Sequence, residues 1–97
     1  MIESFVGKAT EDIFNGKNST AARRLLPRTL WAVAFRKLDQ LDSANVLDDV
    51  RVPPGNRLES LKGERTGQFS IRINDQYRLC FEWLGSNAVN VEIADYH

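Results

Sequence analysis

The fold is decided by residues 68–97, which read QFSIRINDQYRLCFEWLGSNAVNVEIADYH. Apolar and polar side chains alternate there in three runs, 69–74, 77–84 and 88–94. A period of two that is rich in β-branched and aromatic residues is typical of a half-buried strand. The two joints, Asn74-Asp75-Gln76 and Gly85-Ser86-Asn87, are short and built from turn-forming residues. The sequence therefore predicts an antiparallel meander of three strands. Its apolar face should hold Phe69, Ile71, Ile73, Tyr77, Leu79, Phe81, Trp83, Val89, Val91 and Ile93.

The apolar face of this sheet needs a cover, and a helix predicted from Pro27 to Ala44 can supply it. Apolar residues recur there at three- and four-residue spacing, at Leu30, Trp31, Ala34, Phe35, Leu38 and Leu41. A shorter helix should begin with Thr10 as its N-cap and end at Gly16. The residues between the two helices, 17–22, are predicted as a loop, although residues 21–26 could also continue into helix.

Two further strands complete the predicted order. Residues 1–6 are expected to form the first strand, and a weak alternation over residues 56–61 predicts the second. The resulting order is β-α-α-β-β-β-β, an α+β fold with both helices packed on one face of a mostly antiparallel sheet. With 97 residues and no internal repeat, the chain should form a single domain over residues 1–97.

Composition indicates an ordinary cytoplasmic globule. The 13 basic and 13 acidic residues balance, which argues against binding by overall electrostatic field. The single cysteine, Cys80, excludes an internal disulfide and fits a reducing compartment. No apolar run approaches the ~18 residues of a membrane span, and the first residues lack the pattern of a signal peptide. We therefore expect no membrane association.

The charges are unevenly distributed along the chain. Residues 51–78 contain six basic and three acidic residues, whereas residues 79–97 contain three acidic residues and no Lys or Arg. A local basic patch is a common device for meeting phosphates, and Arg57, Arg65 and Arg72 are its candidate RNA contacts. A solvated, charged sheet edge is the alternative interpretation.

One group of residues could carry chemistry. One Cys and one His give no metal-ligand spacing, and no glycine-rich phosphate loop or serine nucleophile elbow is present. What remains is the set Lys62, Arg65, Arg78, Asp95, Tyr96 and His97. Each has an ordinary structural explanation when taken alone. Together they supply the cations, the proton acceptor and the acid that RNA cleavage by attack of a 2′-hydroxyl requires.

The same residues fall in blocks that resemble a known family. The block Arg51-Val52-Pro53-Pro54-Gly55-Asn56-Arg57-Leu58-Glu59-Ser60-Leu61-Lys62-Gly63, the strand pair 67–81 and the ending Asp95-Tyr96-His97 strongly resemble HigB-type toxins of the RelE/ParE superfamily, in the GraT-like branch. The resemblance covers nearly the whole chain. It implies a RelE-like fold and the toxin of a type II toxin–antitoxin pair that cuts mRNA in the ribosomal A site.

The resemblance also implies roles for particular residues. Lys62 and Arg78 match family residues that bind phosphate and stabilise charge in the transition state, Tyr96 and His97 match a terminal pair used for proton transfer or base stacking, and Asp95 would orient that pair. No metal or cofactor is expected. The implied partners are a HigA-type helix-turn-helix antitoxin, the ribosome and mRNA, with operator DNA bound only through the antitoxin.

One departure from the family pattern leaves alternatives open. Some HigB toxins carry a histidine three residues before the lysine, where this chain has Glu59. The division of acid and base roles therefore stays undecided. The alternatives are a toxin that binds a protein target such as a topoisomerase, as the ParE branch does on the same fold, and a catalytically weak module that mainly binds its antitoxin.

Overall fold

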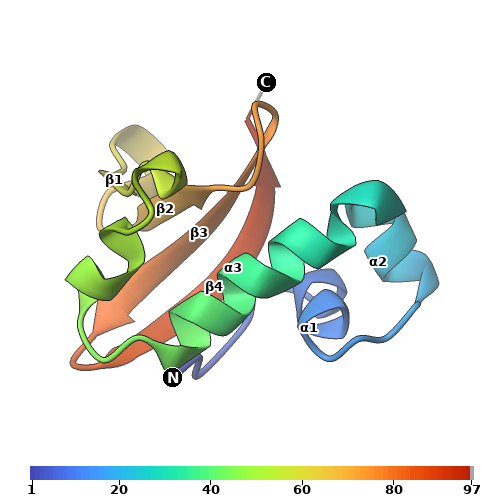
Figure 1. Cartoon of the computed structure of the whole chain (residues 1–97), viewed down its shortest axis with the longest axis horizontal. Coiled ribbons are helices and arrows are strands. Elements are labelled where there is room, and N and C mark those ends of the chain that lie inside the picture. Colours follow the sequence, from blue (N-terminus) through green and yellow to red (C-terminus); the bar gives the residue numbers. More distant parts are fainter. Residues whose placement is uncertain (97) are drawn as a thin grey trace.

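A computed structural model describes residues 1–96 and places a four-stranded antiparallel sheet at the centre of the molecule (Figure 1). The strands β1 (Glu59–Ser60), β2 (Phe69–Arg72), β3 (Tyr77–Leu84) and β4 (Asn87–Asp95) are adjacent in chain order. The turn between β2 and β3 is closed by Asn74, whose Oδ1 accepts from the backbone N–H groups of Gln76 and Tyr77 at 2.9 and 2.7 Å. The predicted meander is thereby confirmed.

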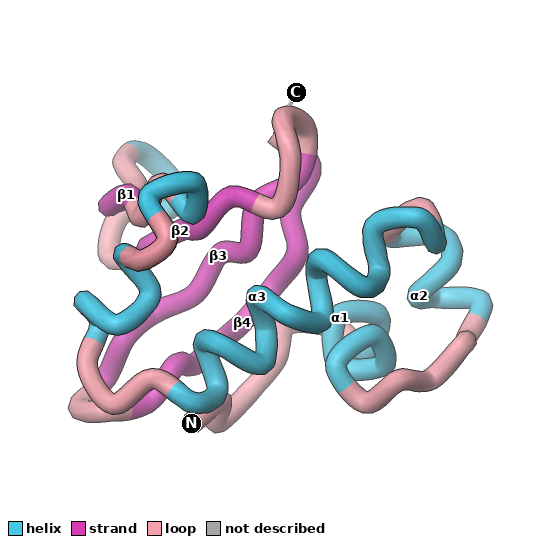
Figure 2. The backbone as a smooth tube through the Cα atoms, viewed as in Figure 1, coloured by secondary structure: helices cyan, strands magenta, loops and turns pink. Residues whose placement is uncertain are grey.

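Three α-helices precede the sheet, where two were predicted. They are α1 (Lys8–Phe14), α2 (Thr20–Leu25) and α3 (Trp31–Ser43). Short 3-10 helices span Arg28–Leu30, Leu47–Arg51, Pro54–Asn56 and Gly63–Arg65. In Figures 1 and 2, α3 lies across the face of the sheet, and α1 and α2 lie together at one end of it. None of the helices among residues 1–96 is long and apolar enough to cross a membrane.

The additional helix begins inside the segment that was predicted as a loop. Ser19 is its N-cap, and the Oγ of Ser19 accepts from the backbone N–H of Ala22 at 3.0 Å. An N-cap of this kind satisfies one of the free donors of the first turn. It explains why helix starts at Thr20, within a stretch whose composition alone suggests a loop.

The start of the chain also differs from the prediction. Residues 1–6 form no strand; they pair with β4 at two isolated parallel bridges, of Ile2 with Ala88 and of Phe5 with Val91. Gly7, at φ 75°, then turns the chain into α1. Thr10, the predicted N-cap, instead lies buried within α1, where its Oγ1 accepts from the backbone N–H of Ile93 at 3.1 Å. The order is therefore α-α-α-β-β-β-β, and Thr10 anchors α1 to the sheet.

The core lies between α3 and the sheet. Ala34, Leu38 and Leu41 of α3 are fully buried, and the sheet contributes Ile71, Leu79, Phe81, Val91 and Ile93. Phe35 was predicted in the same stripe but is 42 % exposed. It lies at the edge of the stripe and stacks on Phe14 of α1, with ring centroids 6.1 Å apart.

A β-bulge in β4 changes which residues face the core. Cys80 pairs with Glu92, but Glu82 pairs with Val89, so β4 holds one extra residue between these pairs. Asn90 has a φ of 53° at this point, as the extra residue of a bulge often does. Ala88 therefore belongs to the core cluster and Val89 does not, contrary to the strict alternation that was predicted. The face of Val91 and Ile93 is as predicted.

Candidate functional site

A cavity of about 280 Å³ opens on the polar side of the sheet, near the end of the chain. It is lined by Arg57, Glu59, Arg72, Asn74, Asp75, Arg78 and Tyr96. Three arginines thus face two carboxylates in one small space. Four residues singled out from the sequence, Arg57, Arg72, Arg78 and Tyr96, come together here although they span 40 positions of the chain.

Arg78 is the most firmly held member of this cavity, with a side chain that is 13 % exposed. Its Nε donates to the Oγ of Ser70 at 2.7 Å, and its Nη2 donates to the backbone carbonyl of Arg57 at 2.6 Å. The carboxylate of Glu59 lies 3.9 Å from the same Nη2. An arginine keeps its charge at any physiological pH and presents its donors in a fixed fork. Held in this way, Arg78 supplies a fixed positive charge with the geometry that suits a phosphate.

The backbone around Arg57 explains how its carbonyl reaches Arg78. The 3-10 helix Pro54–Asn56 ends with Arg57 in the left-handed region, at φ 47°. Asn56 is fully buried, and its Nδ2 donates to the carbonyl of Val50 at 3.0 Å. The Pro-Pro-Gly-Asn block is therefore a rigid turn that places Arg57 and Glu59 at the rim of the cavity.

Tyr96 contributes a protonated phenol. Its ring is 43 % exposed, and its backbone N–H donates to the carbonyl of Gln76 at 2.7 Å. The buried thiol of Cys80 donates to the phenol oxygen at 3.9 Å. Partial burial and the neighbouring Cys80 raise the pKa of Tyr96, although the charges of Arg65 and Arg78 act in the opposite direction. At neutral pH the phenol therefore holds its proton, so that Tyr96 can serve as a donor or an acid.

Arg65, another residue singled out from the sequence, lies outside this cavity. Its Nη2 forms an ion pair with Glu92 at 3.1 Å, and its Nη1 donates to Gln68 at 3.0 Å. Much of its charge is therefore offset by a carboxylate. Its role as an RNA contact stays a prediction, which its pairing with Glu92 and its place outside the cavity do not favour.

Two further predicted site residues, Lys62 and Asp95, are not among those that line the cavity. Lys62 is exposed at the start of the turn Gly63–Arg65 and is not among the residues that line the cavity. Asp95 accepts from the Nε2 of Gln76 at 3.1 Å. His97 lies outside the described residues.

Sequence reasoning overlooked Ser70 and Asn74 and treated Glu59 only as a departure from a pattern. Ser70 is fully buried and holds Arg78, while Asn74 and Glu59 line the cavity. The available signal was strand parity, because Ser70, Arg72 and Arg78 share the polar face of the predicted meander. Within residues 1–96, no group of three or more His, Cys, Asp or Glu side chains has an arrangement that could hold a metal ion.

The sequence of the chain is similar to that of a known family and of two known proteins. A family model described as "RelE-like toxin of type II toxin-antitoxin system HigB" matches residues 3–97. Toxin HigB-1 of Vibrio cholerae serotype O1 is 49 % identical over 67 residues, which cover 69 % of this chain and 70 % of that protein. An uncharacterized protein of Haemophilus influenzae is 39 % identical over 72 residues, 74 % of this chain and 70 % of the relative.

A solved structure supports the fold. The YoeB-YefM complex from Staphylococcus aureus contains a chain that superimposes with a TM-score of 0.58, covering all of this chain and 98 % of its own length. The two sequences are 19 % identical over this match. At that level of identity, the likeness shows a shared fold.

Proposed function

Because the chain belongs to the HigB-like family of RelE-like toxins of type II toxin–antitoxin systems, we propose that it is an mRNA endoribonuclease that acts on the ribosome and stops translation. The observation that carries this proposal is the cavity in which Arg78, fixed by the buried hydroxyl of Ser70, faces Tyr96. A toxin that only binds a protein target needs no such arrangement.

The cavity supplies the parts of one reaction. The 2′-oxygen of a ribose attacks the adjacent phosphorus, the bond from phosphorus to the 5′-oxygen breaks, and the products are a 2′,3′-cyclic phosphate and a 5′-hydroxyl. Negative charge grows on the phosphoryl oxygens as the new bond forms, and Arg78 is placed to stabilise it. We propose that this charge stabilisation comes from side chains and that cleavage needs no metal ion.

Proton transfer completes the proposed reaction. Because the pKa of Tyr96 is raised, its phenol suits donation to the leaving 5′-oxygen or to the phosphate better than removal of a proton. We assign the base to His97, whose type of side chain titrates near pH ~6.5, with Asp95 as its orienting partner. Lys62, exposed at the start of the turn Gly63–Arg65, would bind a phosphate of the RNA outside the cavity. Glu59 stands where some relatives carry a histidine; here it lies beside Arg78, so it moderates the charge of Arg78.

The proposed partner is a HigA-type helix-turn-helix antitoxin that neutralises the toxin in the cytoplasm and carries it to operator DNA. Family membership motivates this proposal. The arginines on the exposed side of α2, Arg23 and Arg24, suit an acidic partner. Co-expression with the neighbouring reading frame should rescue growth and yield a co-purifying complex. Growth arrest that persists, with no complex recovered, would contradict this partnership.

Primer-extension mapping of cellular mRNA after brief induction tests the proposed activity. Wild-type protein should produce new 5′ ends inside translated reading frames, and Arg78→Ala should produce none. Lys17→Ala removes one positive charge from an exposed position after α1 and should cut as the wild type does. Growth arrest without new mRNA ends, accompanied by DNA damage, would point to a topoisomerase target instead.

A further inference from the structure

A second cavity, of about 390 Å³, lies between α3 and the sheet edge at β2. It is lined by Val33, Arg36, Lys37, Gln40, Pro53, Gly55, Arg72 and Ile73. Its lining includes three cations, Arg36, Lys37 and Arg72, and no carboxylate. The Arg78 cavity differs, because Glu59 and Asp75 offset part of its charge. Positive charge is therefore least compensated in this second cavity, which we call the α3 groove.

The wall of the α3 groove is rigid. The ammonium group of Lys37 donates to the Oδ1 of Asn56, a fully buried residue. Asn56 in turn donates from its Nδ2 to the Oε1 of Gln40 at 3.0 Å and to the carbonyl of Val50 at 3.0 Å. Lys37 is thus fixed on the groove wall by a fully bonded amide.

Electrostatics at the α3 groove favour an anion. Partial burial lowers the pKa of Lys37, and the charges of Arg36 and Arg72 lower it further. Asp75, which lies outside the groove lining, pairs with Arg72. Like charges held close together destabilise one another, and an anion placed among them removes that repulsion. A phosphate is the anion that suits such a set of guanidinium and ammonium donors.

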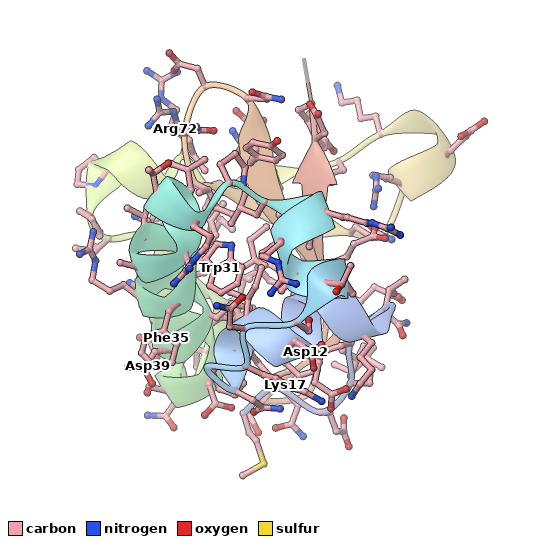
Figure 3. The ribbon with its side chains drawn as sticks, turned by 90° about the vertical axis from the view of Figure 1, so that its right-hand side faces the viewer. Asp12, Lys17, Trp31, Phe35, Asp39 and Arg72 are labelled. Atoms are coloured by element: carbon pink, nitrogen blue, oxygen red, sulfur yellow. The ribbon has the colours of Figure 1, made fainter. Side chains whose placement is uncertain are left out.

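Arg72 connects this groove to the Arg78 cavity, since it lines both. Figure 3 shows Arg72 beside the N-terminal end of α3, away from Asp12 of α1 and from Lys17, which follows α1. Arg72 pairs with Asp75 at 2.5 Å, but the side chain of Asp75 is 98 % exposed. Exposed ion pairs add little to stability, so Arg72 can exchange this partner for a phosphate.

We propose that the α3 groove is a second phosphate subsite for the RNA strand whose scissile phosphate lies at Arg78, with Arg72 between the two. This inference rests on the proposed function. It assigns Arg36 and Lys37 to substrate, although both lie on the helical side that also suits an acidic partner. RNA is favoured over an acidic peptide because the groove shares Arg72 with the proposed catalytic cavity.

Salt dependence of RNA binding tests the subsite without any need for cleavage. The probe is a fluorescein-labelled, fully 2′-O-methylated single-stranded 12-mer, which has no free 2′-hydroxyl, and anisotropy is read against salt concentration. Each phosphate contact on a single strand contributes about 0.7 to the slope of log K against log salt. Arg36→Gln should reduce the slope by about 0.7, whereas Lys17→Gln, an equal charge change at an exposed position after α1, should leave it unchanged.

Two further variants separate charge from packing. Lys37→Gln should also reduce the slope by about 0.7, and Lys37→Arg, which keeps the charge, should restore it. Unchanged slopes for both Arg36→Gln and Lys37→Gln would overturn the subsite. Loss of antitoxin binding by these variants with unchanged RNA slopes would assign the groove to the protein partner, which also overturns it. If the slope falls in Arg36→Gln and Lys37→Gln as expected but the wild-type protein cleaves no mRNA, the proposed function is contradicted, whereas binding of RNA phosphate in the α3 groove is supported.

Discussion

Removing the hydroxyl of Ser70 should slow RNA cleavage while leaving the fold intact. Ser70 is fully buried on β2, and its Oγ accepts from the Nε of Arg78 at 2.7 Å. In Ser70→Ala that hydrogen bond is lost, yet no large cavity forms because only one oxygen atom is removed. The second contact of Arg78, to the carbonyl of Arg57 at 2.6 Å, remains, so the guanidinium should stay near the cavity but less firmly oriented.

The magnitude follows from the kind of bond that is lost. A hydrogen bond to a charged group contributes about 1.5–3 kcal/mol. Converted to a rate at about 1.36 kcal/mol per factor of ten, this is about 10- to 150-fold. The lower half of that range is expected, because the bond from Arg78 to Arg57 persists. If Ser70 positions Arg78 for the transition state, kcat and kcat/KM should fall together.

The assay is cleavage of a short mRNA on purified ribosomes, with Ser86→Ala in the exposed β3–β4 turn as the matched control. Thermal melts of both variants should stay near the wild type. Cleavage by Ser70→Ala at the wild-type rate, while Arg78→Ala is inactive, would refute the positioning role of Ser70. A rise in KM with kcat unchanged would show that Ser70 affects substrate binding only.

Three further outcomes are expected. Phe81 is fully buried, so Phe81→Ala should lower the free energy of unfolding by about 3–5 kcal/mol in denaturant melts. Phe35 is 42 % exposed, so Phe35→Ala should lower the free energy of unfolding much less. Equal losses of stability in the two variants would contradict the assigned core. Tyr96→Phe should slow cleavage by about 10²–10⁴-fold if Tyr96 is the acid. Because the pKa of Tyr96 is raised, loss of the phenol proton should not lower wild-type activity until the pH exceeds ~10. The pKa of Asp12 is lowered chiefly by the hydrogen bond from Ser19, so its stabilising effect should be present above pH ~3.9 and fade as the pH falls through the lower folded value; a stability difference between wild type and Asp12→Asn that persists at pH 2 would contradict this assignment.

The sheet was predictable because its strands follow a simple physical rule. On one face of β2 and β3, Ile71, Leu79 and Phe81 are fully buried in the core. On the other face Arg72, Arg78 and Glu82 stay partly exposed, although Ser70 and Cys80 are buried there too. The bulge in β4 escaped prediction because Asn90 occupies a polar position of the alternation. Its positive φ depends on how the segment before α1 contacts β4, where the backbone N–H of Asn90 donates to the Oγ of Ser4 at 2.8 Å.

The segment before α1 was misread for a related reason. Residues 1–6 have the composition of a strand, yet only Ile2 and Phe5 form bridges with β4. Sequence patterns report the residues of one segment, whereas pairing depends on the twist of the strand that it meets. Ser19 was missed as the N-cap of α2 for the same reason. A serine can be recognised as an N-cap only when the residues after it are known to form a helix that packs on the rest of the molecule.

The candidate site was partly predictable. Family resemblance and parity brought Arg78 and Tyr96 forward, and the structure places both on one cavity. Net charge was less informative, because it treats all cations of 51–78 alike. Arg65 is paired with Glu92, whereas Arg57 lines the cavity. The partner of each cation depends on contacts between segments that are distant in sequence.

The most direct test of the proposed activity is cleavage of a defined mRNA on purified ribosomes with an empty A site. Two substrates are compared, one all-RNA and one with 2′-deoxy sugars in the A-site codon. Wild-type protein should cut the all-RNA substrate in that codon, leave a 2′,3′-cyclic phosphate and spare the deoxy substrate, and Arg78→Ala should cut neither. No cleavage of the all-RNA substrate by wild-type protein, or equal cleavage of the deoxy substrate, would contradict a nuclease that works through the 2′-hydroxyl at Arg78.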